Sequence, residues 1–234
     1  TLRRGRPTVN EQWNNPSSVL VGDFIYSRAF QILVQIGDMH IMRIIADTTN
    51  KIAEGEVLQL ITKNNPNSTQ QDYLQVIENK TAILFQAAAQ CGAILGGAES
   101  AVEDSLKRFG MHLGKAFQLV DDLLDYDGDT QAMGKNIGDD LAEGKPTLPL
   151  IYAMENTNEE QLAIIRQGLK DQTVSEQLLE EVILIVRQSG ALDYTRQLAQ
   201  QHADAAQQCL QVVTESKYRD ALQSMVEFSI ERSS

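Results

Sequence analysis

Apolar residues recur at intervals of three and four along most of this chain. Between Val19 and Ile36 they include Val21, Phe24, Ile25, Ala29, Ile32 and Leu33. This spacing places them on one face of an α-helix. Gly37-Asp38 interrupts the pattern, which resumes from Met39 to Leu60, where Glu54 and Glu56 are interpreted as a solvated patch. We therefore predict two long helices, at 19–36 and 39–60.

Short polar segments separate the other helical patterns. The sequence KNNPNST at 63–69 predicts a loop in which Ser68 or Thr69 caps the next helix. Further helices are predicted at 71–79, 80–97, 99–126, 145–155, 159–170, 175–189, 191–214 and 218–231. Neither strand-like alternation nor an Asn-Gly hairpin signal is present. The pattern predicts one all-α domain covering 1–234, with 1–18 as a loop that ends in a helix cap.

The segment 80–97 is apolar around almost its whole circumference, apart from Lys80, Thr81, Gln86 and Gln90. A helix of this kind is expected at the centre of a protein. Its Ala and Gly residues would let another helix, or a long thin ligand, approach closely. Lys80-Thr81 lies either at the mouth of a cavity or in an ordinary first turn.

Three carboxylates interrupt the apolar pattern near the end of the predicted helix at 99–126. Asp121, Asp122 and Asp125 share one helical face, and Gln118 lies one turn earlier. Like charges at this spacing destabilise a helix by ~0.2–0.5 kcal/mol per pair. Apolar flanks indicate burial, and a buried carboxylate needs a partner. Mg²⁺ binds one or two carboxylates together with substrate phosphates; the alternative is a solvated acidic face.

Composition narrows the classes of function. The chain of 234 residues has 42% hydrophobic residues and a formal net charge of −12, which argues against a nucleic-acid binder. Cys91 and Cys209 indicate neither a disulfide framework nor a metal motif, so a reducing, cytoplasmic location is expected. No run approaches 18 apolar residues, so no transmembrane helix is expected. His40, His112 and His202 lack the spacing of a metal site or triad.

In an acidic protein, the positions of basic residues indicate where anionic ligands bind. Arg3 and Arg4 lie near the start of the chain, and Lys135 and Lys145 lie in a long Gly-rich segment at 127–147. Guanidinium groups grip phosphate oxygens through paired hydrogen bonds, but a solvated basic segment explains the arginines equally well. A loop as long as 127–147 is typical of a functional lid.

Taken together, these motifs resemble those of the trans-isoprenyl diphosphate synthases over nearly the whole chain. The resemblance rests on Arg3-Arg4-Gly5, Lys80-Thr81, Gln118 with DDLLD at 121–125, and GKNIGDDLAEGKPTLP at 134–149. LVGDF at 20–24 and IAEGEVLQL at 52–60 resemble the long-chain polyprenyl branch, which makes octaprenyl or solanesyl diphosphate. The combined motifs, in this order and at these intervals, are far more specific than DDxxD alone.

This resemblance implies a fold, an activity and a cofactor. The fold would be antiparallel helices around a deep central cavity, in a homodimer. The enzyme would condense isopentenyl diphosphate with an allylic prenyl diphosphate such as farnesyl diphosphate. The product would be a long all-trans polyprenyl diphosphate for a quinone side chain, such as that of ubiquinone. Mg²⁺ would assist ionisation of the allylic substrate, and the loop at 127–147 would close over it.

The resemblance also implies roles for individual residues. Asp121, Asp122 and Asp125 would hold Mg²⁺ and serve catalysis together with Lys135 and Lys145. Residues that would bind the allylic diphosphate are Arg3, Lys80, Thr81, Gln118, Lys135 and Lys145. Arg4 would contact isopentenyl diphosphate.

The sequence departs from the family pattern in one respect. Family members carry a first DDxxD motif just upstream of the arginine pair, whereas the motif at 121–125 is the only one in this sequence. We therefore expect the chain to be the C-terminal part of a longer enzyme, with little turnover on its own. The alternative is a non-catalytic regulatory subunit that binds a catalytic homologue and modifies its product.

Related chemistry and a purely structural role both fit the residues less well. A cyclase or head-to-head condensing synthase shares the general fold, but the signature at 134–149 argues against it. A helical bundle without a ligand would leave the acidic cluster and the lysine-bearing loop unexplained.

Overall fold

The computed structural model is mainly helical, which confirms the predicted all-α class. It describes residues 2–3, 6–127, 137–170 and 174–231. The α-helices are α1 (Val9–Gln12), α2 (Asn15–Ile36), α3 (Met39–Thr62), α4 (Gln70–Ile77), α5 (Ile83–Leu95), α6 (Ser100–Asp127), α8 (Asp139–Ala142), α9 (Leu148–Asn156), α10 (Glu159–Lys170), α11 (Glu176–Gln188), α12 (Ala191–Cys209) and α13 (Lys217–Glu231). A π-helical turn, η1 (Glu78–Ala82), joins α4 to α5, and a 3-10 turn, η2 (Leu210–Val212), follows α12.

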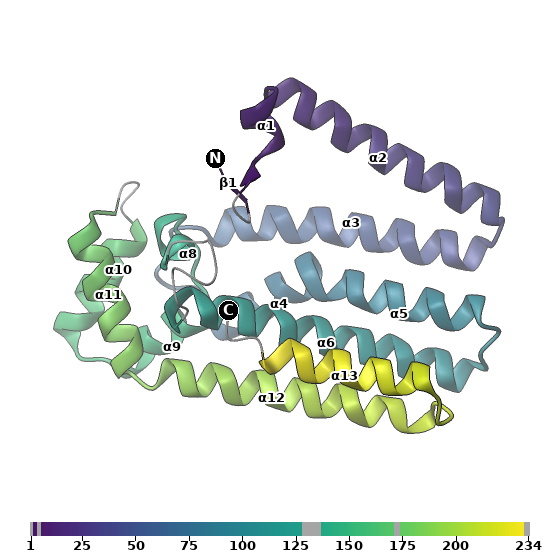
Figure 1. Cartoon of the computed structure of the whole chain (residues 1–234). Coiled ribbons are helices and arrows are strands. Elements are labelled where there is room, and N and C mark those ends of the chain that lie inside the picture. The colour runs from purple at the N-terminus through teal and green to yellow at the C-terminus, as the bar shows by residue number, and fades with distance from the viewer. Residues whose placement is uncertain (1, 4–5, 128–136, 171–173, 232–234) are drawn as a thin grey trace.

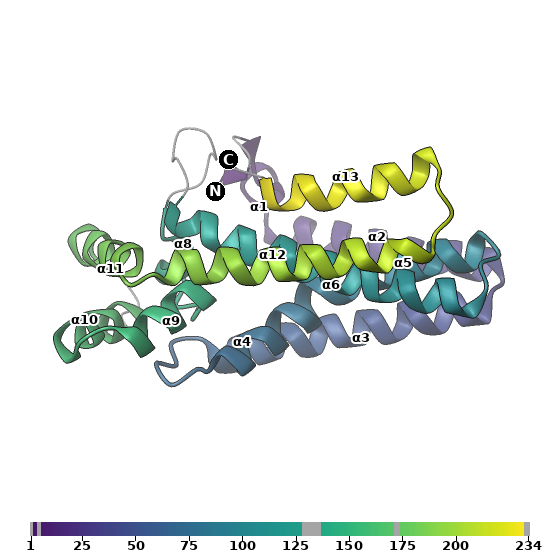
Figure 2. The same ribbon diagram turned by 90° about the horizontal axis from the view of Figure 1, so that it is seen from below.

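Helix α6 runs through the middle of the bundle, with α5 and α12 along its sides (Figures 1 and 2). Its first half buries Phe109, Leu113 and Ala116 against residues of α12, η2 and α13. Its second half belongs to a larger buried cluster that also includes residues of α4 and α8 to α12. Apolar packing therefore fixes α6 along its length, and with it the acidic residues near its C-terminal end.

The predicted helix breaks are confirmed where a specific side chain or backbone angle produces them. Gly37 ends α2 with a positive φ of 73°, and the Asp38 carboxylate accepts from the amides of His40 and Ile41 to start α3. Thr69 starts α4 through a reciprocal capping box with Asp72. Thr69, rather than Ser68, is therefore the cap of the helix after the 63–69 loop.

The N-terminal segment is more ordered than predicted. The interpretation of 1–18 as a loop is wrong, because Leu2–Arg3 (β1) and Arg6–Pro7 (β2) pair antiparallel and α1 follows them. Helix α2 also begins earlier than predicted, at Asn15. The Asn14 side chain accepts from the Ser17 amide, and a proline occupies the first helical turn, where its missing N–H costs nothing.

The segment 80–97, predicted as one central helix, spans the end of η1 and the whole of α5, and only part of α5 is buried. Helix α5 buries Ala87, Cys91 and Ala93, whereas Leu84 is 53% exposed and Leu95 is 64% exposed. Of the small residues in this segment, Ala82, Ala87 and Ala93 are buried, whereas Ala88, Gly92, Gly96 and Gly97 are exposed. Apolar character all round therefore did not mean burial all round.

Helix α2 has no buried residue and meets α3 at the Gly37-Asp38 turn, beyond which the two helices diverge (Figure 1). Its exposed large apolar side chains are Val19, Leu20, Val21, Phe24, Ile25, Tyr26, Ile32, Val34 and Ile36. By length and composition alone, Asn15–Ile36 could cross a membrane. This is weak support for a membrane span, because core helices and signal sequences meet the same criterion.

Candidate functional site

The DDLLD segment lies in the last turns of α6, and its three carboxylates occupy different environments. Asp122 is 4% exposed and Asp125 is 7% exposed, whereas Asp121 is half-buried. The neighbouring Leu119, Val120, Leu123 and Leu124 are buried. The predicted burial of this helix is thus confirmed, but the three aspartates are not equivalent.

Asp122 accepts hydrogen bonds at both carboxylate oxygens. The Tyr73 hydroxyl of α4 donates to Asp122 Oδ2 at 2.6 Å, and Gln118 Nε2 donates to Asp122 Oδ1 at 2.8 Å. The Thr81 hydroxyl donates to Gln118 Oε1 at 2.9 Å. These four residues form a continuous chain of hydrogen bonds, Tyr73–Asp122–Gln118–Thr81, which we call the Tyr73 chain.

Burial raises the pKa of Asp122 well above its ordinary value, and the negative charges of Asp140 and Asp121 act in the same direction. The hydrogen bonds from Tyr73 and Gln118 oppose this shift. Burial likewise raises the pKa of Tyr73, helped by the Asp122 charge. Tyr73 therefore keeps its proton at neutral pH and acts as a donor to Asp122.

Asp125 anchors the segment that follows the Gly-rich loop. Its carboxylate Oδ2 accepts from the backbone amide of Asp140 at 3.1 Å, and its carbonyl accepts from the amide of Gly138 at 2.9 Å. Both partners lie at the start of α8, so Asp125 joins the end of α6 to α8.

Asp121 is the member of the motif with the fewest ties to the protein. Among the described residues, no hydrogen bond or ion pair to its carboxylate is found. Within that same part of the chain, no group of three or more acidic, His or Cys side chains is arranged to hold a metal ion. A cation bound here would therefore use few protein ligands, and Asp121 is the carboxylate best placed to be one.

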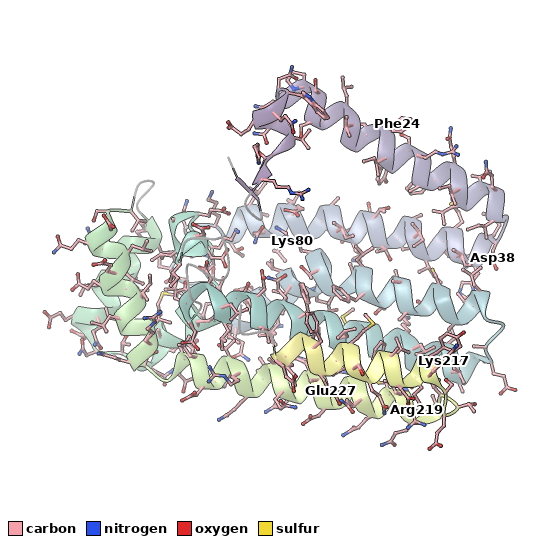
Figure 3. All side chains as sticks on the ribbon, in the orientation of Figure 1. Phe24, Asp38, Lys80, Lys217, Arg219 and Glu227 are labelled. Atoms are coloured by element: carbon pink, nitrogen blue, oxygen red, sulfur yellow. The ribbon has the colours of Figure 1, made fainter. Side chains whose placement is uncertain are left out.

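Lys80 and Thr81 lie in the π-helical turn η1, not in the first turn of a new helix. Lys80 Nζ donates to Gln59 Oε1 of α3 at 2.6 Å and lies 3.2 Å from Glu56 Oε2. In Figure 3, Lys80 lies beside α3 near the middle of the molecule, well away from Asp38. Single π-turns inside helices are frequent at functional sites. Glu56 is exposed, as predicted from the sequence, and is also the charge partner of Lys80.

Gly55 allows α3 to approach η1 closely. A Cβ atom at this position would lie 2.7 Å from the Lys80 backbone nitrogen and 3.0 Å from the Asn79 carbonyl carbon. We expect Gly55→Ala to destabilise the fold by about 1–3 kcal/mol through overpacking. The measurement is urea denaturation beside Gly22→Ala, where a Cβ meets nothing within 4 Å. Gly22→Ala is expected to be neutral or stabilising, and equal effects of the two would contradict the close approach.

Lys145 is held between two carboxylates. Its Nζ lies 2.9 Å from Asp140 Oδ1 and 2.7 Å from Glu143 Oε2. Burial opposes the charged form of Lys145, but the two carboxylates more than offset this effect and raise the pKa of Lys145 above its usual range. The preceding Gly144, with φ of 73°, accepts at its carbonyl from the Asn64 amide at 2.8 Å. Lys145 is thus a fixed positive charge beside α6.

The remaining predicted site residues can be placed only in part. Arg4 and Lys135 lie outside the residues that the structure describes. Of Arg3 the structure describes the backbone, in β1. Sequence reasoning missed Tyr73 and Asp140, which contact DDLLD directly. No spacing in the sequence relates Tyr73 to Asp122, because the two residues are 49 positions apart and lie on different helices.

The structure also brings together two histidines whose positions in the sequence indicated no relation. Nδ1 of His112 on α6 lies 3.0 Å from Nδ1 of His202 on α12. Burial lowers the pKa of His202 to about 4, and the His112 and Lys115 charges add to this shift. Burial also lowers the pKa of His112, helped by Lys115 and Arg108. At pH 7 both rings are therefore neutral, and the Nδ1–H of one ring donates to the Nδ1 of the other.

This pair predicts that stability falls in mild acid. Below pH 6.5, His202 of the unfolded state binds a proton, whereas folded His202 stays neutral until about pH 4. The free energy of unfolding is therefore highest above pH 6.5 and falls as the pH approaches 4. Allowing for solvent screening, the loss is about 2 kcal/mol. Unfolding free energies of the wild type and His202→Gln should therefore converge between pH 7 and 4.5. Parallel pH profiles would contradict the assignment.

Comparison with known proteins adds to this geometry. The family model described as polyprenyl synthetase matches residues 1–186. The chain belongs to this family. It is 47% identical over 231 residues to the octaprenyl diphosphate synthase of Haemophilus influenzae, covering 99% of this chain and 70% of that enzyme. It is 48% identical to the geranyl-diphosphate-specific all-trans-nonaprenyl-diphosphate synthase of Rhodobacter capsulatus, covering 99% and 70%.

A solved structure of the polyprenyl synthetase family shares the fold. The polyprenyl synthase of Caulobacter crescentus, crystallised with calcium and isoprenyl diphosphate, superposes with a TM-score of 0.94 at 39% identity. The match covers 100% of this chain and 71% of that one. The resemblance inferred from the motifs is thereby confirmed at the level of family and fold.

Proposed function

We propose that this protein is a prenyltransferase that condenses isopentenyl diphosphate with an allylic diphosphate into a long-chain all-trans polyprenyl diphosphate. The observation that carries the proposal is the grouping of anion-binding and cation-binding side chains around the end of α6. Asp121 has no described partner. Gln118 lies one turn earlier on α6 and accepts a hydrogen bond from Thr81 of η1. Lys145 is held near the end of α6 by its bond to Asp140. The octaprenyl and nonaprenyl relatives support a long product.

Mg²⁺ is the proposed cofactor, and the donor set fits it. Mg²⁺ favours one or two carboxylates plus substrate phosphates over a site made of protein ligands alone. Asp121 offers carboxylate oxygens to which no described protein group donates a hydrogen bond. Asp122 and Asp125 already accept from Tyr73, Gln118 and Asp140. We therefore propose Asp121 as the main ligand, with Asp125 and Asp122 supporting its surroundings. When bound, Mg²⁺ neutralises negative charge on the leaving diphosphate.

The side chains of this protein perform the rest of the proposed reaction. Lys80, Thr81, Gln118 and Lys145 would hold the allylic diphosphate, with Arg3 and Lys135 completing the clamp, and Arg4 would hold isopentenyl diphosphate. Donors arranged in advance around the diphosphate stabilise the charge that develops as the allylic C–O bond breaks. The double bond of isopentenyl diphosphate then attacks the allylic carbon, and loss of a proton completes the cycle. No side-chain nucleophile is needed.

A homodimer in the cytoplasm that supplies a quinone side chain remains part of the proposal. The exposed apolar residues of α2 support self-association, because monomers rarely expose large contiguous apolar patches. Light scattering of the purified protein tests the dimer directly.

A regulatory subunit of a heteromeric synthase is the alternative that an activity assay tests. Such a subunit would alter the product of a catalytic homologue without turnover of its own. The test is an assay of the protein expressed from its complete reading frame, with farnesyl diphosphate, labelled isopentenyl diphosphate and Mg²⁺. Long labelled products that disappear with a chelator support the synthase, and no product would refute it in favour of the regulatory subunit.

A further inference from the structure

Tyr73 contacts no residue assigned to substrate, yet it ends the hydrogen-bond chain that includes two of them. Its ring is buried in the larger apolar cluster, which fixes the position of the hydroxyl. That hydroxyl donates to Asp122 at 2.6 Å, the shortest contact in the Tyr73 chain. Burying an Asp–Tyr pair costs free energy unless the polar atoms of both side chains form hydrogen bonds. Such a pair beside the proposed diphosphate site suggests a functional role.

The Tyr73 chain determines how Gln118 is oriented. In the structure, the Gln118 atom that faces Asp122 is the amide nitrogen, which donates to Asp122 Oδ1. The amide oxygen then faces Thr81 and accepts its hydroxyl proton. One N–H of Gln118 remains outside the chain and is available to a phosphate oxygen. If Asp122 lost its hold, the amide could flip and present an oxygen to the anion instead.

We propose that Tyr73 is a positioning residue for the diphosphate site, acting through Asp122 to fix the donor orientation of the Gln118 amide. This inference rests on the proposed prenyltransferase function. Tyr73 secures Oδ2 of Asp122, so Oδ1 stays directed at the Gln118 amide. Asp122, interpreted from the sequence as a metal ligand, thereby becomes the link between a core tyrosine and the anion-binding residues.

The test compares Tyr73→Phe with Tyr194→Phe in the protein expressed from its complete reading frame. Both variants remove one tyrosine hydroxyl that bonds across helices, but Tyr194 donates to Gln70 at 2.9 Å and is not part of the Tyr73 chain. Calorimetry measures the Kd of inorganic diphosphate in the presence of Mg²⁺. Tyr73→Phe should raise this Kd and the KM for the allylic substrate about tenfold. The KM for isopentenyl diphosphate should stay within about twofold, and Tyr194→Phe should resemble the wild type.

A double-variant cycle separates positioning from simple stability. In a Gln118→Ala background, Tyr73→Phe should change the diphosphate Kd less than about twofold, because the residue that it positions is gone. An additive loss in the cycle, or a Tyr73→Phe Kd equal to the wild-type value, would overturn the proposal. Should Tyr73→Phe fold poorly, a crystal structure of the wild type with Mg²⁺ and diphosphate decides. The proposal requires a Gln118 N–H to contact the anion, and an intact Tyr73 chain without that contact overturns it.

The failure of this inference differs from the failure of the proposed function. If the wild type makes labelled polyprenyl product but Tyr73→Phe matches it in every constant, only the positioning role is wrong. If the wild type neither binds diphosphate nor makes product, the prenyltransferase function is wrong and the role of Tyr73 falls with it.

Discussion

Asp121→Ala is expected to lower kcat/KM for chain elongation by about a thousandfold, the scale seen when one preorganised electrostatic contact to a developing charge is removed. Asp121 is the carboxylate of DDLLD without a described partner in the protein, so its loss should remove a cation ligand and little else. The measurement is the steady-state elongation rate as a function of Mg²⁺ concentration. The variant should also need more Mg²⁺ to reach its half-maximal rate.

Asp104→Ala is the matched control for this experiment. Asp104 lies on the same helix, is exposed, and is far in sequence from the DDLLD turn. It should retain wild-type rate and Mg²⁺ dependence, and both variants should melt near the wild-type temperature. An Asp121→Ala enzyme with an unchanged elongation rate would show that the cation is bound elsewhere.

Lys145→Met is expected to lower kcat about a hundredfold, because the methionine keeps much of the lysine stem but removes a fixed positive charge from the proposed leaving group. The accompanying change in KM should be largest for the allylic substrate and small for isopentenyl diphosphate. It also leaves Asp140 and Glu143 without their shared cation, so some loss of stability is expected. Activity must therefore be measured well below the melting temperature of the variant.

Lys170→Met provides the comparison, since Lys170 is exposed at the end of α10. Lys145→Met combined with Asp140→Asn then separates the two effects. Removing the unpaired charge of Asp140 should restore the free energy of unfolding but not kcat. Recovery of both would mean that Lys145 serves the fold alone and takes no part in catalysis.

The helices that the sequence predicted well share a simple physical origin. Those at 159–170, 175–189 and 218–231 bury one apolar stripe, and the structure places them within one residue of the predicted bounds. Prediction was poorer for α5, where Ala87, Gln90, Cys91 and Ala93 are buried while the larger Leu84 and Leu95 are exposed. Hydrophobicity of a side chain does not report how closely a neighbouring backbone approaches, and that distance depends on the partner helix.

The candidate site shows the same limit more sharply. The motif predicted which residues belong to the site, but it predicted the same metal-binding role for all three aspartates. Their environments differ because of partners supplied by other elements, such as Tyr73, which is 49 positions from Asp122. Sequence spacing describes neighbours on one helix, whereas the hydrogen-bond partner of a buried carboxylate is decided by how helices pack.

The π-turn at 78–82 has a consequence for aligning or redesigning this segment. A π-turn is equivalent to one extra residue inserted in an α-helix, and one residue corresponds to about 100° of rotation. Residues on either side of the turn therefore follow two different helical phases, although 70–95 is continuous helix. Deleting one residue between 78 and 82 would leave a helix but rotate α5 against α4. A relative without the π-turn, aligned to this chain without a gap, could match every apolar position of α4. The residue aligned with Lys80 would then still lie on a different face of the helix.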